Sequence, residues 1–170
     1  CIENTIEAFQ DVKVNLLQGR FFLPEYEMSA EEKVYKTHKE LFLHYIEEGF
    51  QEKVVKAGKD VDIYWSRVEE ELEVIELGGF IDYFLILVDF YRFAKEKGIW
   101  MGVGRGSASG SLSSYLIGIT GIDPLEYGLL FERFLNRNRI KLGLPDIDAD
   151  CQSTRRNEIK DYLESKYARD

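Results

Sequence analysis

Three aspartates at every second position, Asp146, Asp148 and Asp150, are the residues of this chain best suited to chemistry. A strand would aim all three carboxylates at one face, where without counter-charge they would repel one another and take up protons. A divalent cation relieves that repulsion, and hard oxygen ligands suit Mg²⁺, Mn²⁺ or Ca²⁺ rather than zinc. The pattern therefore predicts a metal site on an extended segment, with an exposed acidic strand or loop as the alternative.

Two carboxylates at positions i and i+2 also have the spacing for a pair of metal ions. On a strand they stand roughly 7 Å apart at Cα and lean the same way. One carboxylate can then bridge two ions ~3.5–4 Å apart, the arrangement used for in-line nucleotidyl transfer. An EF-hand loop beginning at Asp146 is excluded, because its sixth position is Cys151 and its twelfth is Asn157.

The glycine- and serine-rich turn at 102–111 is the second candidate element. Its glycines let backbone N–H groups approach an oxyanion closely, and Arg105 can donate two hydrogen bonds to phosphate oxygens. A Walker A loop is excluded because residues 98–140 include no lysine, and a dinucleotide fingerprint fails because Ser107 and Ser109 occupy its third-glycine positions. The turn therefore favours phosphate binding, the alternative being a turn needed only for tight packing.

The elements that must position these residues are predicted to be mostly helical. Ser29 and Glu32 form a capping box, which predicts a helix that runs on towards Gly58. The apolar stripe over 61–77 predicts a second helix. Residues 80–97 are almost wholly apolar and predict a largely buried helix, although their centre could equally be a strand.

Two short strands are expected, one directly before the glycine-rich turn and one at the aspartate segment. Residues 99–103 form the first, and 111–119 then continue as a helix. Pro124 suits the first turn of another helix over 125–135, after which the aspartate segment forms the second strand. Ser153 can cap a final helix. These elements predict a mixed α/β fold, rich in helices and with a small sheet.

Composition limits the class of protein. The chain has 170 residues, of which 45% are hydrophobic, enough for one sizeable core. No uncharged apolar run approaches the ~18 residues of a membrane span, so no membrane association is expected. The start, which is acidic and lacks an initiator Met, suggests a piece of a longer protein without a signal peptide. Two cysteines, Cys1 and Cys151, form no disulfide framework, so we expect a reducing cytoplasm.

The net charge of −9 is unevenly distributed along the chain. Residues 1–99 hold 12 Lys+Arg against 21 Asp+Glu, whereas 100–170 hold 10 of each. The negative excess therefore belongs to the first half, and the second half could present a basic rim beside the metal site. The basic residues of that rim are Arg133, Arg137, Arg139 and Lys141.

The chain also carries four recognisable blocks: GRGS at 104–107 with GSL at 110–112, DPLE at 123–126, LFERFLN at 130–136 and PDID at 145–148. Together they resemble the C-family replicative DNA polymerases, the alpha subunit of bacterial DNA polymerase III and its phage relatives. The similarity is dense over 78–170 and thinner over 1–77. The resemblance implies a DNA-directed DNA polymerase as the parent protein, with primer–template DNA, dNTPs and other replisome subunits as partners.

The resemblance also implies a domain organisation. Residues 28–170 would form the amino-terminal part of a palm domain with the polymerase-beta-like nucleotidyltransferase fold. Residues 1–27 would be the junction that follows an absent PHP domain. Because the family's third catalytic aspartate lies further downstream, this chain by itself is expected to be inactive.

Site residues follow from the same resemblance. Gly106 and Ser107 would contact the incoming triphosphate, Arg133 would do likewise, and Arg105 lies beside them in the sequence. The catalytic carboxylates that bind two Mg²⁺ or Mn²⁺ ions would be Asp146 and Asp148, whereas Asp150 is not one of the essential pair.

Several positions depart from the family's usual residues, although none removes a charge that the mechanism needs. Two extra residues between Arg139 and Pro145 lengthen the 137–144 loop, which the resemblance associates with primer-side contacts. Two other functions remain open from the sequence: a template-independent nucleotidyltransferase, and a non-catalytic interaction domain that retains the fold. The substituted positions are Val103, Ala108, Ser109, Arg137 and Cys151.

Overall fold

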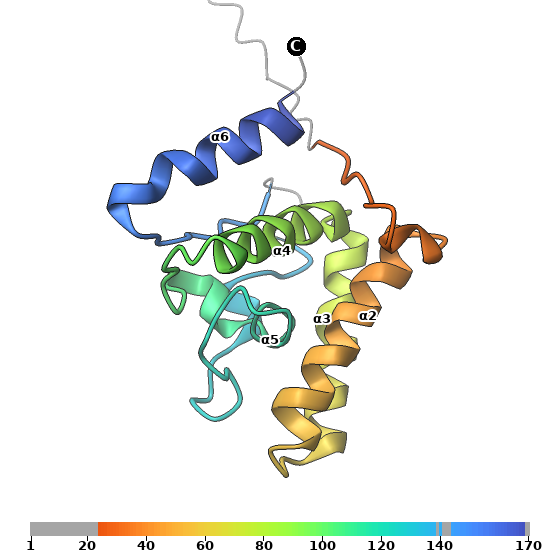
Figure 1. Cartoon of the computed structure of the whole chain (residues 1–170). Helices are drawn as coiled ribbons and strands as arrows, with labels where there is room; N and C mark the ends of the chain where they lie inside the picture. Colours follow the sequence, from red (N-terminus) through yellow and green to blue (C-terminus); the bar gives the residue numbers. More distant parts are fainter. Residues whose placement is uncertain (1–23, 139, 141–143, 169–170) are drawn as a thin grey trace, which may run out of the picture.

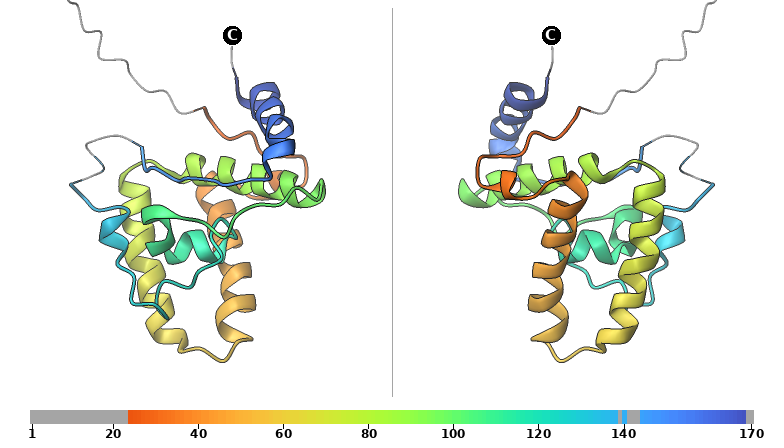
Figure 2. Two further views of the ribbon diagram at one scale, coloured as in Figure 1. Left: turned by 90° about the vertical axis from the view of Figure 1, so that its left-hand side faces the viewer. Right: turned by 90° about the vertical axis from the view of Figure 1, so that its right-hand side faces the viewer.

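Two long antiparallel helices form one side of the molecule. A computed structural model describes residues 24–138, 140 and 144–168. Helix α2, His38–Phe50, continues through a π-helical turn at Gln51–Val55 and is followed by α3, Val61–Leu77. The two lie side by side in Figure 1 and in both views of Figure 2.

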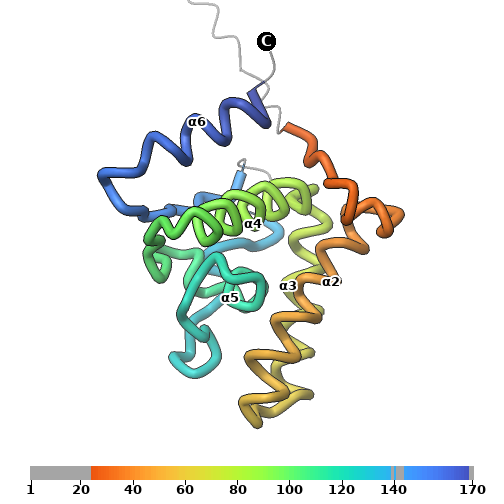
Figure 3. The backbone as a smooth tube through the Cα atoms, in the orientation of Figure 1, coloured from red at the N-terminus to blue at the C-terminus, as the bar shows by residue number. Residues whose placement is uncertain are grey.

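Helix α4, Ile81–Glu96, crosses one end of this pair and is covered on its outer side by α6, Arg156–Tyr167 (Figure 3). The short helix α5, Leu112–Leu116, packs against α2 and α3. Fully buried side chains from all four inner helices, including Phe42, Val68, Phe84 and Leu112, form a single core. The buried helix predicted over 80–97 is thus confirmed, against the strand alternative.

Local capping explains where the helices begin. Asp60 accepts hydrogen bonds from the backbone N–H groups of Asp62 and Ile63, which starts α3 at the predicted position. The predicted capping box also forms, with Ser29 N donating to Glu32 Oε2 at 2.8 Å. It opens only the 3₁₀ turn Glu32–Val34, however, and α2 begins at His38 because Thr37 caps it.

The predicted helix over 125–135 is wrong. Asp123 Oδ1 caps a single turn by accepting from Leu125 N, and Gly128 has a φ of 60°, which ends it. The next helical residues are the 3₁₀ turn Phe131–Arg133. The last helix also differs in detail: Ser153 begins the 3₁₀ turn Ser153–Arg155, and its side chain caps neither turn nor helix.

The expected small sheet is absent from the residues that the structure describes, so the prediction of a mixed α/β fold is wrong. The segments predicted as strands meet only in an isolated antiparallel bridge between Met101 and Cys151. Two backbone hydrogen bonds hold it, Gly102 N to Asp150 O and Gln152 N to Trp100 O, both 2.8 Å. Gly104 then turns away with a φ of 93°, so the pairing cannot extend into a ladder.

The predicted division at residue 28 stays a prediction, because residues 1–23 lie outside the described part of the chain. Tyr26 nevertheless packs with the later residues: its hydroxyl donates to Glu32 and its backbone N–H to Asp82 at 3.4 Å. Among the described residues, no helix is long and apolar enough to cross a membrane.

Candidate functional site

The glycine- and serine-rich segment makes a sharp reversal between the extended residues 99–103 and α5. Arg105 is extended, and Gly104 and Gly106 on either side of it have φ values of 93° and 69°. The 3₁₀ turn Gly106–Gly110 follows, and Ser111 caps α5 by accepting from Ser114 N at 3.1 Å. Positive φ at these two glycines explains why the reversal needs residues without a side chain.

A cavity of about 550 Å³ lies between this turn and the segment that contains Arg133. Gly106 and Ser107 line one wall, and the exposed Arg133 lines the other. The two walls of the cavity approach each other closely at Gly110, where an added Cβ would stand only 2.7 Å from Leu130 O. The structure therefore brings together three of the four residues that the sequence assigned to nucleotide binding.

Arg105, the fourth of these residues, lies against the aspartate segment and does not line this cavity. Its Nη2 is 3.6 Å from Asp148 Oδ1, and its Nε is 3.3 Å from Asp150 Oδ2. All three side chains are about half exposed or more. Since water screens such pairs, they are weak and can exchange partners readily.

The aspartate segment lies beside the glycine-rich turn, as the predicted site requires. A Cβ at Gly106 would be 3.8 Å from Asp148 Oδ2. Tyr83 of α4 lies close to the same segment: burial, together with the charges of Asp146 and Asp148, raises the pKa of its hydroxyl to about 12, against the lowering effect of a hydrogen bond with the Ile147 backbone. Both carboxylates thus lie near one face of α4.

The donor set suits a hard divalent cation but is incomplete among the described residues. Asp146 and Asp148 are exposed carboxylates, which offer the oxygen ligands that Mg²⁺ prefers. The described ranges contain no group of three or more His, Cys, Asp or Glu side chains placed to hold one metal ion. The pair could therefore supply part of a coordination shell whose other ligands come from water or phosphate oxygens.

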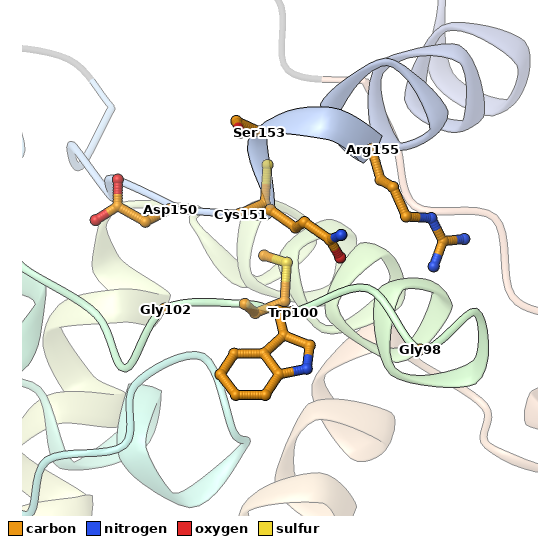
Figure 4. A pocket seen from close by; sticks show the side chains of 9 residues that line it. Gly98, Trp100, Gly102, Asp150, Cys151, Ser153 and Arg155 are labelled. Atoms are coloured by element: carbon orange, nitrogen blue, oxygen red, sulfur yellow. The ribbon is translucent and has the colours of Figure 1, made fainter.

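The predicted basic rim is only partly visible. Arg137 pairs with Glu73 of α3, while Arg139 and Lys141 lie outside the described residues. A second cavity, of about 740 Å³, is lined by both residues of the Met101–Cys151 bridge and by their neighbours in the chain. Figure 4 shows Asp150 and Arg155 towards opposite ends of this cavity, with Trp100 between them.

Sequence reasoning missed two residues of α3 that contact the glycine-rich segment. Glu71, which is fully buried, accepts hydrogen bonds from Ser111 Oγ, Leu112 N and Ser113 N at 2.8–2.9 Å. Arg67 pairs with Glu71 at 2.9 Å and donates to the carbonyls of Gly110 and Leu129. A signal was present in the sequence, because Glu71 falls on the apolar stripe of its helix, where an acid needs a partner.

Comparison with known proteins identifies the family of the chain. Residues 40–170 match the bacterial DNA polymerase III alpha NTPase domain. DNA polymerase III subunit alpha of Staphylococcus epidermidis is 56% identical over 89 residues, which cover 52% of this chain and 8% of the relative. The Streptococcus pyogenes subunit is 52% identical over 92 residues, 54% of this chain and 9% of the relative. The matches thus span less than a tenth of the length of those relatives. Because the family match covers more than half of this chain, the chain belongs to the bacterial DNA polymerase III alpha family.

Proposed function

We propose that this chain is the part of a DNA-directed DNA polymerase that binds the incoming dNTP and supplies two carboxylates for catalytic metal ions. The observation that carries the proposal is the cavity shared by Gly106, Ser107 and Arg133, which lies next to Asp148. Membership of the polymerase III alpha family supports the template-directed reaction over template-independent nucleotidyl transfer.

The cavity offers the groups that a triphosphate needs. Backbone N–H groups and the Ser107 hydroxyl can donate to phosphate oxygens from one wall, while Arg133 can donate two charged hydrogen bonds from the other. Because a triphosphate carries several negative charges, a guanidinium is a stronger partner than a neutral donor. Arg105 would join them by exchanging its exposed aspartate partners for phosphate oxygens.

Asp146 and Asp148 would hold the metal ions, Mg²⁺ or Mn²⁺, with Asp150 in a lesser role. When bound, such ions lower the pKa of an attacking hydroxyl and neutralise the charge of the leaving pyrophosphate. The residues of this chain would orient the triphosphate beside those carboxylates, with its phosphorus in line for attack by the primer 3′-OH. Primer–template DNA and other replisome subunits are the partners implied for the parent protein.

Nucleotide binding can be tested on the 170-residue chain itself. Titration of the ¹⁵N-labelled chain with dATP and Mg²⁺ should shift the amide resonances of Gly106, Ser107 and Gly110. Arg133→Ala should weaken binding at least about tenfold, because a hydrogen bond to a charged group contributes roughly 1.5–3 kcal/mol. Ser107→Ala should weaken it about threefold, as expected for a neutral hydrogen bond.

Arg156→Ala, on the exposed surface of α6, is the matched control and should leave the dATP affinity unchanged. The proposal fails if dATP shifts resonances elsewhere only, or if Arg133→Ala and Ser107→Ala bind dATP as tightly as the unmodified chain.

A further inference from the structure

A buried carboxylate connects α3 to the segment that forms the nucleotide pocket. Glu71 has no exposed surface, and both of its oxygens are engaged. Oε1 accepts from Leu112 N at 2.8 Å and Arg67 Nε at 2.9 Å, and Oε2 accepts from Ser113 N and Ser111 Oγ. The carboxylate therefore fixes the residues that directly follow the glycine-rich turn.

Arg67 connects the two walls of the cavity. Its Nη2 donates to Gly110 O at 3.0 Å, on the glycine-rich wall, and to Leu129 O at 3.2 Å, on the wall that continues to Arg133. Both carbonyls belong to residues that line the cavity. One guanidinium thus joins both walls, while Glu71 holds that guanidinium from behind.

We propose that Arg67 and Glu71 are positioning residues for the nucleotide, which set the spacing between the Gly106–Ser107 wall and Arg133. This inference rests on the proposed function, since it assumes that a triphosphate occupies that cavity. Neither side chain lines the cavity itself, so they act through the backbone of its walls.

The energetics of the pair favour a geometric role over a purely stabilising one. Taking a carboxylate and a guanidinium out of water is costly, and well-packed apolar residues of similar volume are often at least as stable. A guanidinium, in contrast, holds several acceptors in a fixed planar arrangement that apolar packing cannot reproduce. The close approach of Gly110 to Leu130 O, which leaves no room for a Cβ, shows how tightly the wall spacing is defined.

Two conservative substitutions test the role. Arg67→Lys keeps the charge, but a single ammonium cannot hold Glu71 and both carbonyls in the same planar arrangement. Glu71→Gln keeps the shape of the side chain, but its amide nitrogen, itself a donor, would face one of the groups that donate to the Glu71 carboxylate. Each should weaken dATP binding by the 170-residue chain about tenfold, because small errors in the placement of binding groups are costly.

Two controls separate positioning from stability. Val68→Ala removes a fully buried side chain from the same helix, so it should lower the melting temperature with little change in dATP affinity. Glu76→Gln, also on α3, breaks an exposed pair with Lys39 of α2 and should change neither quantity.

A double-mutant cycle with Arg133→Ala gives a readout that a merely structural role would not produce. If Arg67 acts by placing Arg133, the effect of Arg67→Lys on dATP affinity should shrink once Arg133 is absent. Additive effects in the cycle, or dATP affinities for Arg67→Lys and Glu71→Gln no lower than that of Val68→Ala, would overturn the inference. The proposed function fails separately, if dATP does not bind the unmodified chain at millimolar concentration or if Arg133→Ala and Ser107→Ala have no effect.

Discussion

Asp148 is the residue where the proposed metal site and the proposed nucleotide pocket meet. Its carboxylate lies beside Gly106 on one side and near the guanidinium of Arg105 on the other. A metal ion held here would be close to phosphate oxygens in the pocket, so that the charges of ion and triphosphate would stabilise each other.

Replacement of Asp148 by Asn should abolish metal binding. The unmodified chain should bind Mn²⁺ weakly, with a dissociation constant roughly in the millimolar range, because only two carboxylates contribute. An amide oxygen carries no charge, so Asp148→Asn should reduce the calorimetric signal to background. Asp161→Asn, on the exposed face of α6, is the control and should bind like the unmodified chain. Unchanged binding by Asp148→Asn would place the ion elsewhere.

Because of Asp123, the stability of the chain should depend on pH in the acid range. Burial works against its charge, but hydrogen bonds from Lys59, Tyr64 and the Leu125 backbone outweigh burial and lower the pKa of the carboxyl. Because its pKa is lower in the folded state, the contribution of Asp123 to stability is fully present above its pKa in the unfolded chain, about 4. That contribution is lost as pH falls through its pKa in the folded chain.

Asp123→Asn should therefore lower the free energy of unfolding by about 2–3 kcal/mol at neutral pH, because it leaves Lys59 with a weaker partner. The difference from the unmodified chain should shrink as pH falls below about 4, in urea denaturation measured across this range. Glu126→Gln, which removes an exposed partner of Lys59, should cost less than about 1 kcal/mol. A pH-independent difference for Asp123→Asn would contradict this assignment.

At the scale of elements, the glycine-rich segment is positioned because α5 is held tightly between α2 and α3. The α2 side of this contact depends on Gly49, where an added Cβ would stand 2.1 Å from the backbone oxygen of Leu116. The clash involves backbone, so only a displacement of α5 could relieve it.

Gly49→Ala should destabilise the chain by about 2–3 kcal/mol, even though alanine favours helices, because overpacking outweighs the gain in helix propensity. It should also weaken dATP binding, since α5 begins two residues after Gly110, the last residue of the glycine-rich wall of the cavity. Gln51→Ala, exposed at the start of the next turn, should have little effect in the same thermal melts. An equally or more stable Gly49→Ala chain would show that α2 and α5 are less tightly packed than described.

At the scale of the whole molecule, this chain by itself should not extend a primer. Two-metal catalysis needs both ions in a fixed geometry, and the described residues offer no group of three metal-ligating side chains. A net charge of −9 also disfavours the phosphate backbone of primer–template DNA. Primer extension should be undetectable for the chain and present for a full-length polymerase III alpha, whereas extension by this chain that is lost in Asp146→Ala would contradict the prediction.

The sequence by itself determined the long helices and the residue types of the site. Caps and apolar periodicity are local properties, so α3 was predicted with its observed limits, and the glycine-rich turn and Asp146–Asp148 were recognisable as candidates. Their roles as nucleotide and metal ligands remain proposals.

Only the tertiary structure decided how these parts meet. A strand needs partners that are distant in the chain, and the alternating aspartates met residues 99–103 in a single bridge instead of a sheet. The helix expected after Pro124 gave way to a single turn, which is capped by Asp123, itself held by Lys59 and Tyr64, and is ended by Gly128. The contacts of Glu71 likewise span about 40 residues of sequence. A local pattern shows that a buried acid needs a partner, but it does not show which distant residue becomes that partner.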